Sequence, residues 1–147
     1  MEKKRRILIR CLFVLYAAAL LLLLFHRAPM AESHYNLRPL KTIGDYFKVL
    51  RRNDPAGLAF RSYALKNFLG NILVFVPLGV FLPLLFQKQR SFLLFLLSVC
   101  AGIFLIELIQ YVSQLGSLDV DDLILNVPGA CLGWLAWRFW PKEKKKE

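Results

Sequence analysis

Hydrophobic residues in this chain gather in four long runs separated by more polar segments. The runs cover residues 7–25, 67–86, 91–112 and 123–140, and each is 18 to 22 residues long. A helix rises ~1.5 Å per residue, so about 20 apolar residues cross the ~30 Å hydrocarbon core of a bilayer. The pattern predicts an all-α membrane protein, a compact bundle of four transmembrane helices. Four spans leave no room for a soluble domain, so we expect residues 1–147 to form a single membrane domain.

The segment 26–66, between the first two runs, is predicted to be an external loop that contains one amphipathic helix. Its apolar positions with helical spacing are Ile43, Tyr46, Phe47 and Leu50. Its charged positions are Lys41, Asp45, Lys48, Arg51 and Arg52. A helix of this kind suits the membrane interface, although packing on the protein's own outer surface is an equal alternative. We expect it to end before Pro55, because the residue before a proline avoids helical geometry.

Prolines and glycines in the second and fourth runs bear on how the helices pack. Pro77 and Pro83 each remove a backbone donor and can kink the second helix. Gly129 and Gly133 are four residues apart and therefore share one face of the fourth helix. Small residues allow membrane helices to approach closely. The glycine pair is expected to face a neighbouring helix.

The net charge of +10 sets an expected orientation in the membrane. Basic clusters at 3–6, 88–90 and 142–146 all fall on one side of a four-span protein. The positive-inside rule places that side, with both termini, in the cytoplasm, so we predict a multi-pass plasma-membrane protein. Cations placed beside membrane segments suit anionic lipid, and we expect no nucleic-acid partner.

Two features of the chain oppose this orientation. The segment 26–66 would be external, yet it carries eight Lys and Arg against three acids. The first run also has the basic start and apolar centre of a signal peptide, although the residues after it form a poor cleavage site. A cleaved signal peptide is therefore the alternative interpretation of residues 7–25.

Acidic residues are concentrated near the predicted outer ends of the last two runs. The chain has ten acids, and four of them lie within sixteen positions: Glu107, Asp119, Asp121 and Asp122. An Asp at a membrane helix centre costs ~2.5–3.5 kcal/mol on insertion scales, so each needs a partner or a water-filled cavity. Amides and two cations are expected at the same depth. The candidate binding site comprises Asn67, Asn71, Glu107, Gln110, Asp119, Asp121, Asp122 and Asn126, with Arg61 and Lys66 within reach.

These polar residues allow both structural and chemical roles. Amides hydrogen-bond between membrane helices, and Asp121 or Asp122 can cap the fourth helix. Glu107 lies inside a run and cannot cap, so it is the candidate catalytic residue, acting as a general base. Alternatively, Glu107, Asp119 and Asp122 could ligate a divalent cation, the one cofactor that the residues suggest. The residues alone favour neither chemistry.

Three stretches of this chain resemble the VanZ-like family of bacterial membrane proteins. The first is the Asn-, Pro- and Gly-marked stretch 71–79, and the second is the Glu-x-x-Gln motif at 107–110. The third is the Asp-x-Asp-Asp…Asn block at 119–126, followed by two glycines. The resemblance extends over roughly 37–134. Family members often have an Arg shortly before the Asp block, where this chain has residues 114–117 instead. If that Arg pairs with the acids or with an anionic ligand, Arg61 or Lys66 must substitute for it, or the site differs.

The family is named for a protein that lowers susceptibility to teicoplanin-type glycopeptides, drugs that bind cell-wall precursors outside the membrane. The resemblance therefore implies a bacterial cell-envelope role related to antibiotic resistance, without supplying a mechanism. One hypothesis is a non-catalytic protein that binds the headgroup of a membrane lipid or lipid-linked cell-wall precursor. The alternatives are a membrane enzyme that modifies such a molecule, and an assembly factor whose polar residues only lock the helices. The ligand and the oligomeric state stay open.

Overall fold

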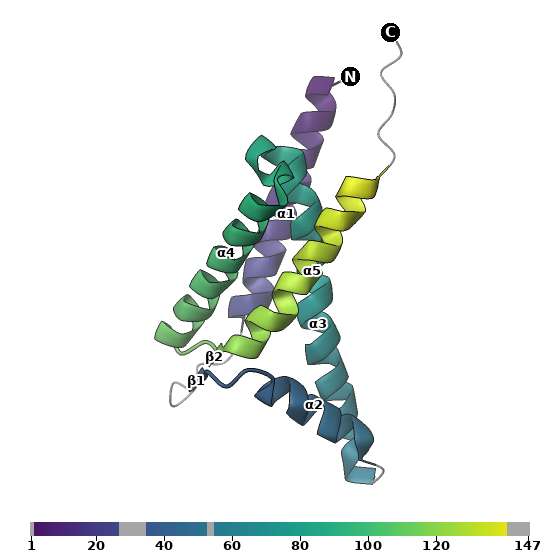
Figure 1. Cartoon of the computed structure of the whole chain (residues 1–147), viewed down its shortest axis with the longest axis vertical. Coiled ribbons are helices and arrows are strands. Elements are labelled where there is room, and N and C mark those ends of the chain that lie inside the picture. Colours follow the sequence, from purple (N-terminus) through teal and green to yellow (C-terminus); the bar gives the residue numbers. More distant parts are fainter. Residues whose placement is uncertain (1, 27–34, 53–54, 141–147) are drawn as a thin grey trace.

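The computed structural model describes residues 2–26, 35–52 and 55–140, which form an elongated helical bundle (Figure 1). The described residues contain five α-helices: α1 (Glu2–Phe25), α2 (Lys41–Arg51), α3 (Pro55–Leu85), α4 (Phe92–Val112) and α5 (Val120–Phe139). A short 3-10 helix, η1 (Gln87–Arg90), connects α3 to α4. Two-residue strands, β1 (Tyr35–Asn36) and β2 (Leu118–Asp119), pair in parallel. The predicted all-helical character is thus confirmed, with one small strand pair added.

Three helices of the described chain are long and apolar enough to cross a membrane. They are the segments Lys3–Phe25, Phe60–Leu85 and Phe92–Val112 of α1, α3 and α4. The fourth predicted span, 123–140, is helical as α5 but is not among them. The reason is composition, since α5 starts with Asp121 and Asp122 and continues with polar and small residues.

The exterior of the bundle is far more apolar than that of a soluble domain. Large apolar side chains such as Leu22, Leu73 and Leu97 lie more than half exposed on α1, α3 and α4. The interior combines an apolar core, which includes Phe75 and Phe95, with a few buried polar side chains such as Asp121 at 0% exposure. An extended apolar exterior is costly in water and favourable in lipid. The exterior and the three apolar helices together indicate a membrane protein.

The most extensive helix–helix interface in the described structure joins α3 to α5. A Cβ added at Gly129 would overlap the backbone carbonyl oxygen of Ile72, and one at Gly133 would overlap that of Val76. The two backbones touch directly at these glycines, as the sequence predicts. α3 is helical throughout, so Pro77 and Pro83 lie within it without ending it.

The segment between the first two apolar runs differs from the predicted loop. α2 forms where expected and ends at Arg51. α3, however, begins at Pro55, so residues 55–66, which were predicted to lie in the loop, are helical. Proline fits the first turn of a helix, where its missing N–H has no partner to lose. α2 packs against α3, and the ring centroids of Phe47 and Phe68 are 5.8 Å apart.

The elements separate into two ends of the bundle. The start of α1, η1 and the last turns of α5 lie at one end, whereas β1, β2 and α2 lie toward the other (Figure 1). Two of the three basic clusters predicted to share a side, at 3–6 and 88–90, therefore share an end. The third, at 142–146, lies outside the described residues.

Candidate functional site

The acidic cluster lies at the end of the bundle opposite η1, where two distant loops meet (Figure 1). The strand pair sets the register there, with Tyr35 beside Leu118 and Asn36 beside Asp119. Backbone pairing thus brings residues 35–36 against the turn that enters α5. The acids of that turn can therefore contact residues about 80 positions earlier in the chain.

Asp119 is the N-cap of α5 and also binds side chains of the segment 35–52. Its Oδ1 accepts hydrogen bonds from the backbone N–H of Asp121 at 2.9 Å and from Asn36 Nδ2 at 3.0 Å. Its Oδ2 accepts one from Thr42 Oγ1 at 2.6 Å. The sequence favours Asp121 or Asp122 for this cap, but Asp119 alone has the extended backbone that an N-cap needs.

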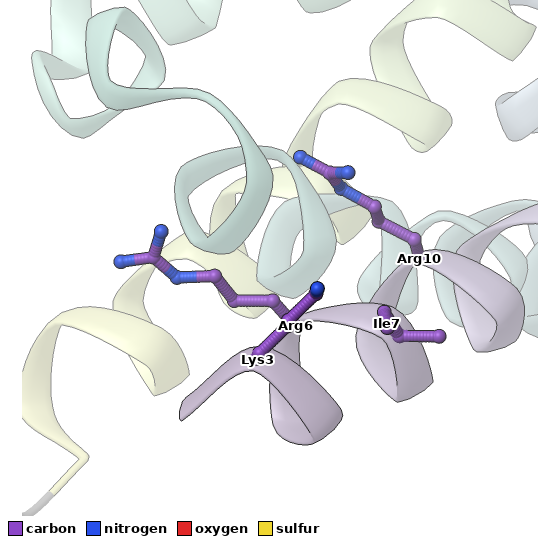
Figure 2. Close-up of a pocket in the computed structure, with 4 residues that line it drawn as sticks. All are labelled: Lys3, Arg6, Ile7 and Arg10. Carbon is purple, nitrogen blue, oxygen red and sulfur yellow. The ribbon is translucent and has the colours of Figure 1, made fainter. Parts of the chain in front are cut away.

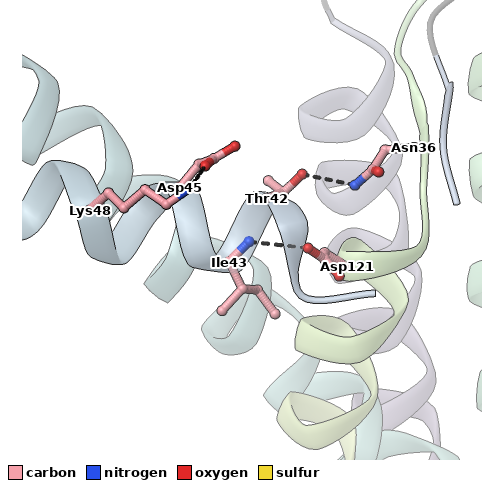
Figure 3. Close-up of polar contacts among 6 residues, drawn as sticks. All are labelled: Asn36, Thr42, Ile43, Asp45, Lys48 and Asp121. Atoms are coloured by element: carbon pink, nitrogen blue, oxygen red, sulfur yellow. Dashed lines mark hydrogen bonds and ion pairs between the residues drawn. The ribbon is translucent and has the colours of Figure 1, made fainter. Parts of the chain in front are cut away.

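Asp121 caps a helix, but that helix is α2 rather than its own. Its Oδ1 accepts a hydrogen bond from the backbone N–H of Leu40 at 2.6 Å. Its Oδ2 accepts one from the backbone N–H of Ile43 at 3.1 Å (Figure 3). Leu40 provides no side-chain cap for α2. The first N–H groups of a helix need outside acceptors, and its positive dipole end favours a carboxylate. A buried acid of α5 supplies both.

Glu107 and Gln110 are buried on the same face of α4, at 5% and 3% exposure, as their spacing predicts. Glu107 Oε2 accepts a weak hydrogen bond from the backbone N–H of Asp119 at 3.4 Å. Gln110 Nε2 donates to the Leu24 carbonyl at 2.8 Å, in the last turn of α1, where carbonyls lack intrahelical partners. The two side chains therefore connect α4 to the α5 turn and to α1.

The amides of α3 and α5 complete the cluster. Asn71 Nδ2 donates to Asp122 Oδ1 at 2.5 Å, which joins α3 to α5. Asn67 lies one turn earlier on α3, and its buried Nδ2 donates no hydrogen bond to a described residue. Asn126 is 4% exposed, and its Oδ1 likewise has no partner among the described residues. The region between α3 and α5 therefore contains one buried donor and one buried acceptor that make no hydrogen bond to described residues.

Neither candidate cation, Arg61 or Lys66, donates a hydrogen bond to Asp119 or Asp121 in the described structure. Arg61 donates to the backbone carbonyl of Arg52, and Lys66 is exposed on α3. The hydrogen bonds of Asp119 and Asp121 to described residues all come from N–H, amide and hydroxyl groups. Neutral donors and a helix dipole, rather than Arg61 or Lys66, thus satisfy these carboxylates.

The geometry also bears on the suggested cation site. Within residues 2–26, 35–52 and 55–140, no three His, Cys, Asp or Glu side chains are arranged to hold a metal ion. The oxygens of Asp119 already face hydrogen-bond donors, which a bound cation would have to displace. Glu107, Asp119 and Asp122 therefore do not form a ready ligand set in this structure.

The sequence did not predict the partners that the segment 35–52 provides. They are the Asn36 and Thr42 side chains and the backbone N–H groups of Leu40 and Ile43. One signal was available, because α2 begins at Lys41 with no Ser, Thr, Asp or Asn at the preceding position. A helix without its own cap needs an acceptor from elsewhere, and the acids of the Asp block are the natural source.

Comparison with known proteins now defines the class of this membrane helical bundle. The model of the VanZ/LLP1 family matches residues 12–141, which includes all three resembling stretches. The chain belongs to the VanZ/LLP1 family. No curated protein and no solved structure matches it.

Proposed function

We propose that this protein is a cell-envelope membrane protein that binds an anionic headgroup, of a lipid or a lipid-linked cell-wall precursor, on the surface of α2. Through this binding it lowers susceptibility to teicoplanin-type glycopeptides. The acid and amide cluster serves this function by holding α2 in position. The observation that carries the proposal is the capping of α2 by Asp121.

The charges favour α2 over the acids as the contact surface. A phosphate group is repelled by carboxylates and attracted by exposed cations. Lys41 and Arg51 are exposed at the two ends of α2. Lys48 pairs with Asp45 at 2.8 Å, and this hydrogen bond lowers the pKa of the Asp45 carboxyl (Figure 3). Lys41 and Arg51 are therefore the cations best suited to an external phosphate.

The apolar side of α2 supports a position at the membrane interface. Ile43, Tyr46 and Leu50 are half-buried, and Phe47 is 50% exposed while its ring contacts Phe68. α2 thus rests partly on the protein and keeps apolar surface for the headgroup region of a bilayer. On this proposal α2 is the interfacial helix, α5 is the fourth span, and both termini are cytoplasmic.

The test is the susceptibility of a Gram-positive host to teicoplanin and vancomycin at matched membrane levels of each variant. Lys41→Gln/Arg51→Gln removes two cations from α2. The control, Arg5→Gln/Lys88→Gln, removes two cations from the opposite end. Wild type and control should both protect against teicoplanin while the α2 variant fails to protect. Equal protection by all three would overturn the assignment to α2, and no protection by wild type would overturn the resistance role.

A further inference from the structure

A basic groove lies at the other end of the bundle, remote from α2 and the acid cluster. It has a volume of about 180 Å³ and lies between α1, the end of α3 and η1. Its lining residues are Arg6, Ile9, Arg10, Leu84, Leu85, Gln87 and Arg90. Three arginines from two separate elements thus surround one hollow that has apolar walls.

The spacing of residues on α1 extends this groove. Lys3, Arg6, Ile7 and Arg10 recur at three- and four-residue intervals, so they share one helix face. Together they line a second hollow of about 580 Å³, which shares Arg6 and Arg10 with the groove (Figure 2). The cationic surface therefore continues from η1 along the first turns of α1.

The fold fixes the η1 side of the groove. Arg90 Nε donates to the Pro83 carbonyl at 3.3 Å, in the last turn of α3. Trp134 Nε1 of α5 donates to the Gln89 carbonyl at 3.0 Å. Arg90 is thus held beside Leu84 and Leu85 by a turn that is itself fastened to α5.

From this geometry we infer that the groove binds the phosphodiester headgroup of an anionic phospholipid. Arginine donors match phosphate oxygens, and several arginines can share one phosphate or two adjacent ones. The described residues that line the groove include no acid. Leu84, Leu85 and Ile9 form the apolar walls of the groove, and such walls suit the first carbons of an acyl chain. Free phosphate has no apolar part that could contact these walls.

The test titrates the full chain, purified in detergent, with short-chain phosphatidylglycerol and reads bound lipid by native mass spectrometry. Arg10→Gln/Arg90→Gln changes the groove. The matched control, Arg5→Gln/Lys88→Gln, removes the same charge from α1 and η1 at positions that do not line it. We expect about five- to tenfold weaker lipid binding for the groove variant and little change for the control, as for loss of charge-assisted hydrogen bonds.

Further arms of the experiment distinguish a specific lipid site from bulk charge and from a free-phosphate site. Arg10→Gln alone, compared with Arg5→Gln, leaves the Arg90 bond to Pro83 in place, and it should still weaken lipid binding. Equal losses in groove and control variants would overturn the inference in favour of bulk charge. Binding of phosphatidylcholine as strong as that of phosphatidylglycerol would overturn the preference for an anionic lipid. Competition by inorganic phosphate at equal concentration would overturn the lipid as occupant.

Discussion

The Asp121 carboxylate of α5 accepts a hydrogen bond from the backbone N–H of Ile43 in the first turn of α2, over 3.1 Å (Figure 3). The same carboxylate accepts the N–H of Leu40. An acid at the end of a membrane bundle is thereby satisfied by the start of a helix 78 residues earlier in the chain. The position of the amphipathic α2 therefore depends on a side chain of α5.

Asp121→Asn should weaken this attachment. Asparagine has a single acceptor oxygen, and its amide group would point a donor at an N–H group. We expect a loss of about 1–3 kcal/mol in the free energy of unfolding and faster hydrogen exchange in α2. The control is Asp45→Asn, on the exposed side of α2. Equal protection of α2 amides in wild type and the Asp121 variant would contradict the capping role.

Gly129→Ala should disrupt the α3–α5 interface, because the new methyl group would overlap the Ile72 carbonyl. Overpacking of this kind costs about 1–3 kcal/mol or more when backbone must move. The readout is the thermal unfolding temperature of the purified protein, together with its membrane level. Gly70→Ala on α3 is the matched control, since nothing lies within 4 Å of its added Cβ. A similar unfolding temperature for both variants would show that the helices do not meet at Gly129.

Two substitutions of Glu107 separate structural from chemical roles. Glu107→Gln keeps an oxygen that can accept the Asp119 N–H, whereas Glu107→Leu leaves that buried donor unsatisfied. We expect the free energy of unfolding of Glu107→Gln to stay near that of the wild type. For Glu107→Leu we expect it to fall by about 1–3 kcal/mol. Drug protection should follow stability in both. A stable Glu107→Gln protein that no longer protects would instead favour a direct role of the carboxylate in chemistry or ligand binding.

The Asn71–Asp122 hydrogen bond between α3 and α5 should appear as an energetic coupling. A double-mutant cycle of Asn71→Ala and Asp122→Ala isolates this term. Interhelical hydrogen bonds in membrane proteins average about 0.6 kcal/mol and reach about 1.7, so we expect a coupling energy in that range. Unfolding in denaturing detergent supplies the four free energies. Strictly additive effects would show that this bond contributes nothing.

The helices were predictable because their signal is local. Apolar runs predicted α1, α4 and α5 to within a few residues, and the spacing of Ile43 and Leu50 predicted α2. The start of α3 could not be predicted in this way. Pro55 is a signal that a preceding helix ends, but it also fits the first turn of the next helix.

The candidate site was predictable in its members but not in its pairings. The sequence predicted that the acids and amides gather at one end of the bundle. It did not predict the contacts of Asp119 with Asn36 and Thr42, because these residues are about 80 positions apart in the chain. No local pattern encodes a two-residue strand pair, and the uncapped start of α2 shows that an acceptor is needed without showing which acid provides it. The membrane depth assigned to these residues stays a prediction.

The central claim is that residues 35–43 are fastened to the turn before α5 by Asp119 and Asp121. Disulfide formation between Tyr35→Cys and Leu118→Cys tests it most directly, because paired strand residues lie close enough for a disulfide. In intact membranes, with the three native cysteines replaced, we predict efficient cross-linking that falls sharply when Asp119 and Asp121 become Asn. Absence of the cross-link, or its persistence at full yield in the double Asn variant, would contradict the claim.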